Sequence, residues 1–134
     1  MGGLALDKED KGNFSTAIGY AALTDQDFAT STNANNTAVG YVAGGGVTVG
    51  VANTLIGSIA GDVLTDADDN VAVGYSALTS DTLGHKSTAI GRSALATQNF
   101  TTTSDSFNTA VGYRSGASVT TGQSNTVIGH NAGV

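Results

Sequence analysis

The sequence predicts an all-β protein, a parallel β-solenoid or β-roll of about seven coils with a base period of 17. A segment of the type Asn/Ser-Thr-Ala-Val/Ile-Gly recurs seven times at regular spacing, and glycine is frequent while proline is absent. Repetition at a short fixed period is typical of solenoids, whose coils each contact only their neighbours. The glycines that end these segments, called here the anchor glycines, are Gly19, Gly40, Gly57, Gly74, Gly91, Gly112 and Gly129.

The spacing of the anchor glycines defines the domain organisation. The interval between successive anchors is 17 in four cases and 21 in two, and copies at an offset of 72 are similar in sequence. We therefore assign residues 12–134 to the repeat domain and residues 1–11 to a polar N-terminal tail or cap. The two longer intervals correspond to longer connections, residues 24–35 and 96–107.

The residues before each anchor glycine alternate in character, as expected for a short strand. Thr and Ile/Val fall on one face and Ala and Asn/Ser on the other, because successive strand side chains point to opposite sides. The frequent glycines and the absence of an apolar stripe disfavour helix. We expect the Ile/Val column to form the core and the Asn/Ser column to form a hydrogen-bonded ladder between coils.

Composition excludes several classes of function. The chain has 11 acidic and 5 basic residues, a net charge of −6, so binding to a nucleic-acid backbone is disfavoured. No apolar run is long enough to insert in a membrane, the N-terminus does not resemble a secretory signal, and the lack of cysteine excludes disulfides and zinc–thiolate sites. The segment at residues 84–88 lacks the glycine pattern of a phosphate-binding loop, and no catalytic triad motif is present. We expect no enzyme activity and no cofactor.

The repeat units resemble the head repeats of trimeric autotransporter adhesins, the YadA-like heads, whose units carry a Ser-Val-Ala-Ile-Gly strand. Residues 70–74, Asn-Val-Ala-Val-Gly, and residues 87–91, Ser-Thr-Ala-Ile-Gly, match best. Similar Asn-Thr-Ala-Val-Gly-Tyr units occur in bacteriophage tail fibres. The resemblance covers residues 12–133 and implies a left-handed roll, a homotrimer, and an adhesive role in host or surface attachment, on a virion tail fibre or a bacterial cell surface.

A physical argument also favours a homotrimer. One Ile/Val per coil, surrounded by Ala and Thr, buries little apolar area against the entropy of ordering the chain. Columns of small Ala residues would allow three copies to approach closely and share a second core. The expected partner is therefore the chain itself.

An ice-binding or calcium-binding module is the alternative function. Rows of Thr spaced by about 4.8 Å could organise water, although Thr shares its face with Ile/Val and is expected to point inward. The acidic turn at residues 62–70 contains weak candidate calcium ligands, but it lacks the glycine and glutamate of an EF-hand loop. These weak candidates are Asp66, Asp68 and Asp69.

Two groups of residues are candidates for contact with a glycan or protein receptor. The long connections repeat a Gln-Asp/Asn-Phe pattern, and insertions in a solenoid are expected to leave the coil outward. Their Phe side chains would either pin a neighbouring subunit or contact the receptor. The residue after the anchor glycine is often Tyr, which would either stack on sugars or form a packing ladder. The candidates are Gln26, Phe28, Gln98, Phe100, Tyr20, Tyr41, Tyr75 and Tyr113.

Overall fold

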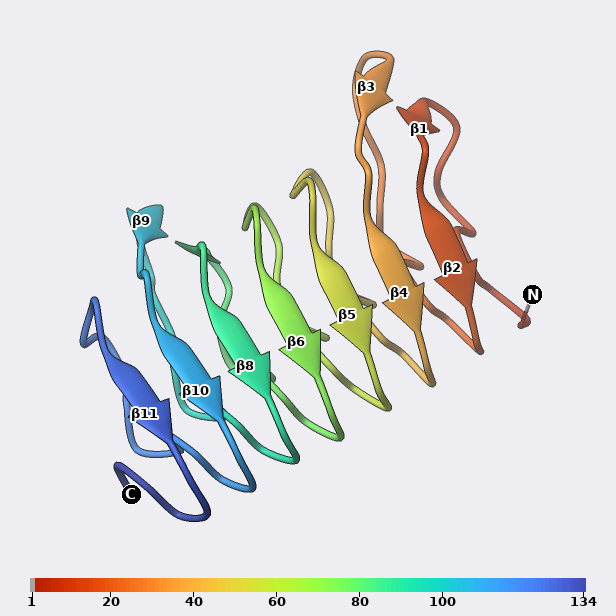
Figure 1. Ribbon diagram of the computed structural model, residues 1–134. Helices are drawn as coiled ribbons and strands as arrows, with labels where there is room; N and C mark the ends of the chain where they lie inside the picture. The colour runs from red at the N-terminus through yellow and green to blue at the C-terminus, as the bar shows by residue number, and fades with distance from the viewer. Residues whose placement is uncertain (1) are drawn as a thin grey trace.

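Seven parallel strands lie side by side in one sheet, which forms one wall of a rod of stacked coils (Figure 1). The computed structural model describes residues 2–134, and within them there is no helix. This confirms the predicted parallel β-solenoid of about seven coils. Along the sheet, in the order of pairing, the strands are β11 (Thr126–Ile128), β10 (Thr109–Val111), β8 (Thr88–Ile90), β6 (Val71–Val73), β5 (Thr54–Ile56), β4 (Thr37–Val39) and β2 (Thr16–Ile18).

The register of the sheet aligns equivalent residues of every coil. Thr37 pairs with Thr54, and Val39 with Ile56, across one coil of the base length. The two longer coils keep the same register in the main sheet, and each long connection adds one strand to a small ladder outside it. These ladders pair β1 (Gly12–Asn13) with β3 (Thr32–Asn33), and β7 (Gly84–His85) with β9 (Ser104–Asp105).

The anchor glycines are required where the chain turns at the end of each strand. Gly74 has φ +134°, and a Cβ there would lie 2.6 Å from the carbonyl carbon and oxygen of Gly91. Both the backbone conformation and the contact exclude a side chain. At other corners of the coil, residues with side chains adopt left-handed φ values, among them Ser76 at +53° and Lys86 at +61°.

The interior is filled by Ala and Leu rather than by the Ile/Val column. The middle residue of each strand in the main sheet is buried in all but β11, as in Ala38 and Ala72, and residues that follow the turn, such as Leu78, are also buried. The expectation that Ile/Val forms the core is wrong: Ile18 is 51% exposed. The expectation that Thr points inward is wrong for the same reason, since Thr and Ile/Val share a face.

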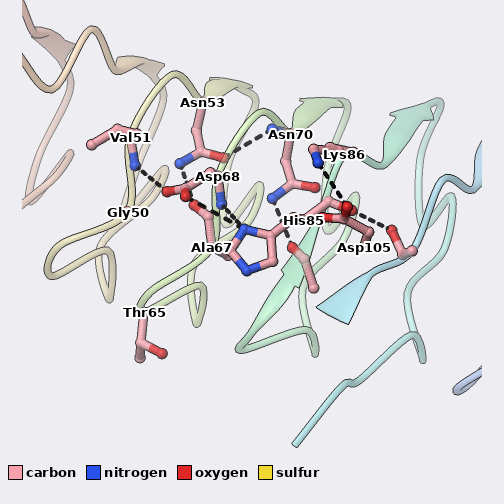
Figure 2. Close-up of polar contacts among 12 residues, drawn as sticks. Gly50, Val51, Asn53, Thr65, Ala67, Asp68, Asn70, His85, Lys86 and Asp105 are labelled. Carbon is pink, nitrogen blue, oxygen red and sulfur yellow. Dashed lines mark hydrogen bonds and ion pairs between the residues drawn. The ribbon is translucent and has the colours of Figure 1, made fainter. Parts of the chain in front are cut away.

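The Asn ladder explains which face of the strand turns inward. The Oδ1 atom of Asn53 accepts a hydrogen bond from the N–H of Asn70 at 3.0 Å, and its Nδ2 donates to the carbonyl of Ala67 at 2.7 Å (Figure 2). Asn36, Asn70 and Asn108 make equivalent bonds. Because the ladder satisfies these amides internally, Asn is buried together with Ala, and alternation then places Ile/Val and Thr outside. The predicted ladder is confirmed.

The N-terminal segment follows the path of the coils from residue 2 onward, and Met1 lies outside the described residues. Leu6 donates its N–H to the carbonyl of Ala22, and Ala21 donates to Gly3. Leu4 and Leu6 have left-handed φ values, as have Ala21 and Leu23 at the equivalent positions of the next coil. Residues 2–6 therefore cover the end of the core as a partial coil, with Ala5 and Leu6 packed against it.

Candidate functional site

The outward face of the seven-stranded sheet is a continuous surface without charged side chains. It consists of the first and third residues of each strand, so it carries one column that is mostly Thr and one of Ile/Val. Ile56 and Ile90 are each 39% exposed, and Ile128 is 69% exposed. All eleven acidic residues lie outside this sheet. Four of its seven Ile/Val residues, Ile18, Ile56, Ile90 and Ile128, are exposed, so the face is a candidate interaction surface.

The Tyr column borders this face, directly after the anchor glycines. Tyr20, Tyr41, Tyr75 and Tyr113 are 40–57% exposed. Tyr20 and Tyr41 stack with their ring centroids 5.7 Å apart. These two rings therefore pack against each other between coils, and all four Tyr side chains keep part of their surface accessible to a partner.

The four candidate receptor residues in the long connections lie inside the protomer. Gln26 and Gln98 are fully buried, and Phe28 and Phe100 are only 4% and 5% exposed. Phe100 covers Gly84, where an added Cβ would lie 2.9 Å from the ring. The expectation that these side chains face outward, to a receptor or to a neighbouring subunit, is wrong.

The buried Gln side chains instead continue the Asn ladder where the coil has Ser at the ladder position. The Oε1 atom of Gln98 accepts a bond from Asn108 Nδ2 at 2.7 Å, while its Nε2 donates to Ser87 Oγ at 2.8 Å. Gln26 bonds Asn36 and Ser15 in the same way. Ser is too short to bridge the coils alone, so the long connections supply the missing amide.

Two carboxylates complete these networks, and the sequence analysis missed both of them. Asp81 is fully buried and accepts bonds from the N–H groups of Gly84 and Phe100 and from Gln98 Nε2. Glu9 accepts bonds from the N–H groups of Lys11 and Gly12. The signal that could have found them is their equivalent position in the two similar halves of the chain, each three residues before a glycine.

The pKa of Glu9 is lowered from its ordinary value. Burial alone would raise it, but the hydrogen bonds from Gly12 and Lys11 stabilise the charged form and outweigh that effect. The lowered pKa therefore favours the ionised form of the Glu9 carboxylate, which accepts these backbone hydrogen bonds.

Within residues 2–134, the acidic turn does not belong to any group of three His, Asp or Glu side chains that could hold one metal ion. Asp66 and Asp69 are exposed, and the residue between Asp66 and Asp68 is the buried Ala67. The Oδ1 atom of Asp68 accepts a bond from the N–H of Val51 at 2.8 Å (Figure 2). This hydrogen bond therefore joins the coil of Asp68 to the preceding coil, which contains Val51.

A shallow cavity of about 340 Å³ lies beside this turn. On its wall, His85 Nδ1 accepts the N–H of Asp68 at 2.9 Å, and Lys86 Nζ lies 2.7 Å from Asp105 Oδ2 (Figure 2). The hydrogen bond to Asp105 raises the pKa of Lys86. Both contacts join neighbouring coils. They connect β7 and the adjacent Lys86 to the preceding coil through Asp68 and to the following coil through Asp105. The lining residues are Asp68, Asp69, His85, Lys86, Thr103, Ser104 and Asp105.

Comparisons with family models, with curated proteins and with solved structures found no match for this chain. Within residues 2–134 there is also no helix long and apolar enough to cross a membrane. The fold and its outward face are therefore the observations on which a function can be argued.

Proposed function

We propose that this chain is a structural and adhesive segment of a trimeric surface fibre, such as a bacteriophage tail fibre or a bacterial adhesin head. Three copies pack through the outward face of the sheet, and the assembled rod attaches a virion or a cell to a host or other surface through a glycan or protein receptor. The role requires no catalysis. The resemblance of the repeats to YadA-like heads agrees with this proposal.

The observation that carries the proposal is the exposed, uncharged Ile/Val and Thr face. Its apolar side chains gain free energy when they leave water, and each chain has a thin core built mainly from Ala. Because every acidic residue lies elsewhere, copies of a chain with net charge −6 can meet on this face without placing like charges together.

The proposal is tested with two substitutions of similarly exposed residues. Ile56, 39% exposed, lies on β5, next to the central strand of the face, whereas Val63, 37% exposed, lies on the connection between β5 and β6. We expect Ile56→Glu to dissociate the assembly in native mass spectrometry and Val63→Glu to leave it intact. An assembly that survives Ile56→Glu would refute packing through this face. Retention of protein-coated beads on host cells under flow then tests adhesion separately.

Ice binding is a second candidate function, favoured by one observation. The Thr column points outward, in rows that repeat with the strand spacing of about 4.8 Å. The same face cannot both pack against a second copy and contact ice. Thermal hysteresis by the chain in monomeric form, lost in Thr54→Lys, would favour this candidate over the fibre segment.

A further inference from the structure

The residues that follow the anchor glycines form one continuous column along the rod. The backbone keeps them in register: Ile59 donates its N–H to the carbonyl of Tyr41 at 2.8 Å, and Ser76 donates to Ser58 at 3.1 Å. Tyr41, Ser58 and Tyr75 are therefore three successive rungs. The whole column is Tyr20, Tyr41, Ser58, Tyr75, Arg92, Tyr113 and His130.

Every rung except Ser58 carries a flat side chain. Tyr113 and His130 stack with their centroids 5.3 Å apart and their planes 13° from parallel, much like Tyr20 and Tyr41. Arg92 lies between two rings, with its guanidinium carbon 5.4 Å from the centroid of Tyr75 and 5.7 Å from that of Tyr113. The column thus already holds one guanidinium between two Tyr rings.

Ser58 is the one short side chain of the column, and it stands between the next pair of rings. Tyr41 and Tyr75 are two coils apart, about 10 Å at the parallel-strand spacing, which is the same two-coil separation that Arg92 bridges. The hydroxymethyl group of Ser58 is too short to fill this space. Tyr41 is 57% exposed and Tyr75 is 50% exposed, so both rings are open to solvent. We call the space over Ser58, between these two rings, the tyrosine slot.

We propose that the tyrosine slot binds the guanidinium group of an arginine side chain from a partner protein. A guanidinium is planar and delocalised, so it stacks on aromatic faces on both sides and gains cation–π attraction from each ring. Arg92 shows that this column accepts such a group at this spacing. The net charge of −6 further favours a cationic partner.

This inference rests on the adhesive role proposed above and deepens it by naming the chemistry of the partner. It does not depend on the trimer, because binding is measured at individual rings whereas assembly is measured by mass. Loss of the slot and loss of the assembly are therefore separate outcomes.

The test is a titration of the full chain with N-acetyl-arginine amide, followed by NMR of the Tyr ring protons. We expect saturable shifts at Tyr41 and Tyr75 and none at Tyr20. N-acetyl-lysine amide and methyl α-glucopyranoside, at equal concentrations, should shift the same rings several-fold less. The absence of a saturable shift, or tighter binding of the glucoside, would overturn the proposal.

Two reciprocal variants sharpen the test. Ser58→Arg supplies the guanidinium from the chain itself and should abolish the response to the arginine probe. Arg92→Ser opens an equivalent space between Tyr75 and Tyr113, so a second set of shifts should appear at Tyr113. An unchanged response in Ser58→Arg would contradict binding in the slot, whatever the result for Arg92→Ser.

Discussion

The side chain of Leu55 fills the space that Gly61 leaves in the core. A Cβ on Gly61 would lie 2.8 Å from Leu55 Cδ2, and equally close to Leu64 Cδ1. In the next coil the arrangement is reversed, since Ala72 stands at the position of Leu55 and Leu78 at that of Gly61. The two positions therefore share one volume of the core. The side chain of Leu55 occupies it in one coil, and the side chain of Leu78 occupies it in the next.

This relationship predicts strong coupling between two substitutions. Leu55→Ala should cost about 2 to 5 kcal/mol of unfolding free energy by leaving a cavity. Gly61→Leu should cost about 1 to 3 kcal/mol by overpacking, and about 1 to 2 kcal/mol more because Gly61 has φ +54°. The double variant places Ala and Leu as at Ala72 and Leu78 and removes the clash with Leu55, although the contact with Leu64 remains, so its cost should be clearly smaller than the sum. Urea unfolding of the four proteins provides the cycle, and additive costs would show that the positions do not share volume.

The buried Gln98 should be essential to the ladder. Gln98→Leu removes the donor to Asp81 Oδ2 and leaves a buried carboxylate oxygen without that partner. We expect a loss of about 1 to 3 kcal/mol in unfolding free energy. Asn99→Ala, at the exposed neighbouring residue, is the control and should change stability by less than about 0.5 kcal/mol. Equal effects of the two substitutions would exclude a structural role for the amide of Gln98.

The left-handed corner at Ser76 should be relieved by glycine. Ser76 has φ +53°, a conformation that costs L-residues about 1 to 2 kcal/mol. Ser76→Gly should raise the unfolding free energy by about 0.5 to 1 kcal/mol, after allowance for the greater freedom of glycine in the unfolded chain. Ser76→Val should lower the melting temperature, because a branched side chain fits this conformation least. A lower melting temperature for Ser76→Gly would contradict this interpretation of the corner.

The contribution of Glu9 should depend on pH in one direction. Its folded pKa lies below its ordinary value of 4.5, so its stabilisation is present above that pH and is lost as pH falls through the folded pKa. The difference in melting temperature between the wild type and Glu9→Gln should be constant near neutrality and shrink once the pH falls below that ordinary value. Asp66→Asn, at an exposed residue, is the control for general acid effects. A Glu9→Gln difference that grows in acid would mean that the sign is wrong.

The regular features of the fold could be predicted from sequence because each repeats in every coil. The anchor glycines and the alternation around Ala72 and Val73 are enough to define parallel coils in register. Alternation gives two faces of a strand without saying which one turns inward. That choice depends on the Asn ladder, whose buried amides bring the Ala face inside and leave Ile18 and its equivalents outside.

The long connections were harder to predict because they depend on contacts between coils. A polar Gln in an insertion suggests a surface loop, yet Gln26 replaces a ladder amide that Ser15 is too short to supply. The tyrosine slot likewise depends on coil spacing. The sequence alone does not distinguish Ser58 from other Ser residues, whereas the stacking of the coils places it between the exposed rings of Tyr41 and Tyr75.

The most direct test of the proposed fibre segment is the mass of the particle in solution, measured by sedimentation equilibrium over a range of concentrations. Packing through the Ile/Val and Thr face predicts a species of three times the 13.2 kDa of one chain. The same measurement on Ile56→Glu should give single chains. A stable wild-type species of 13.2 kDa at every concentration would contradict assembly through this face.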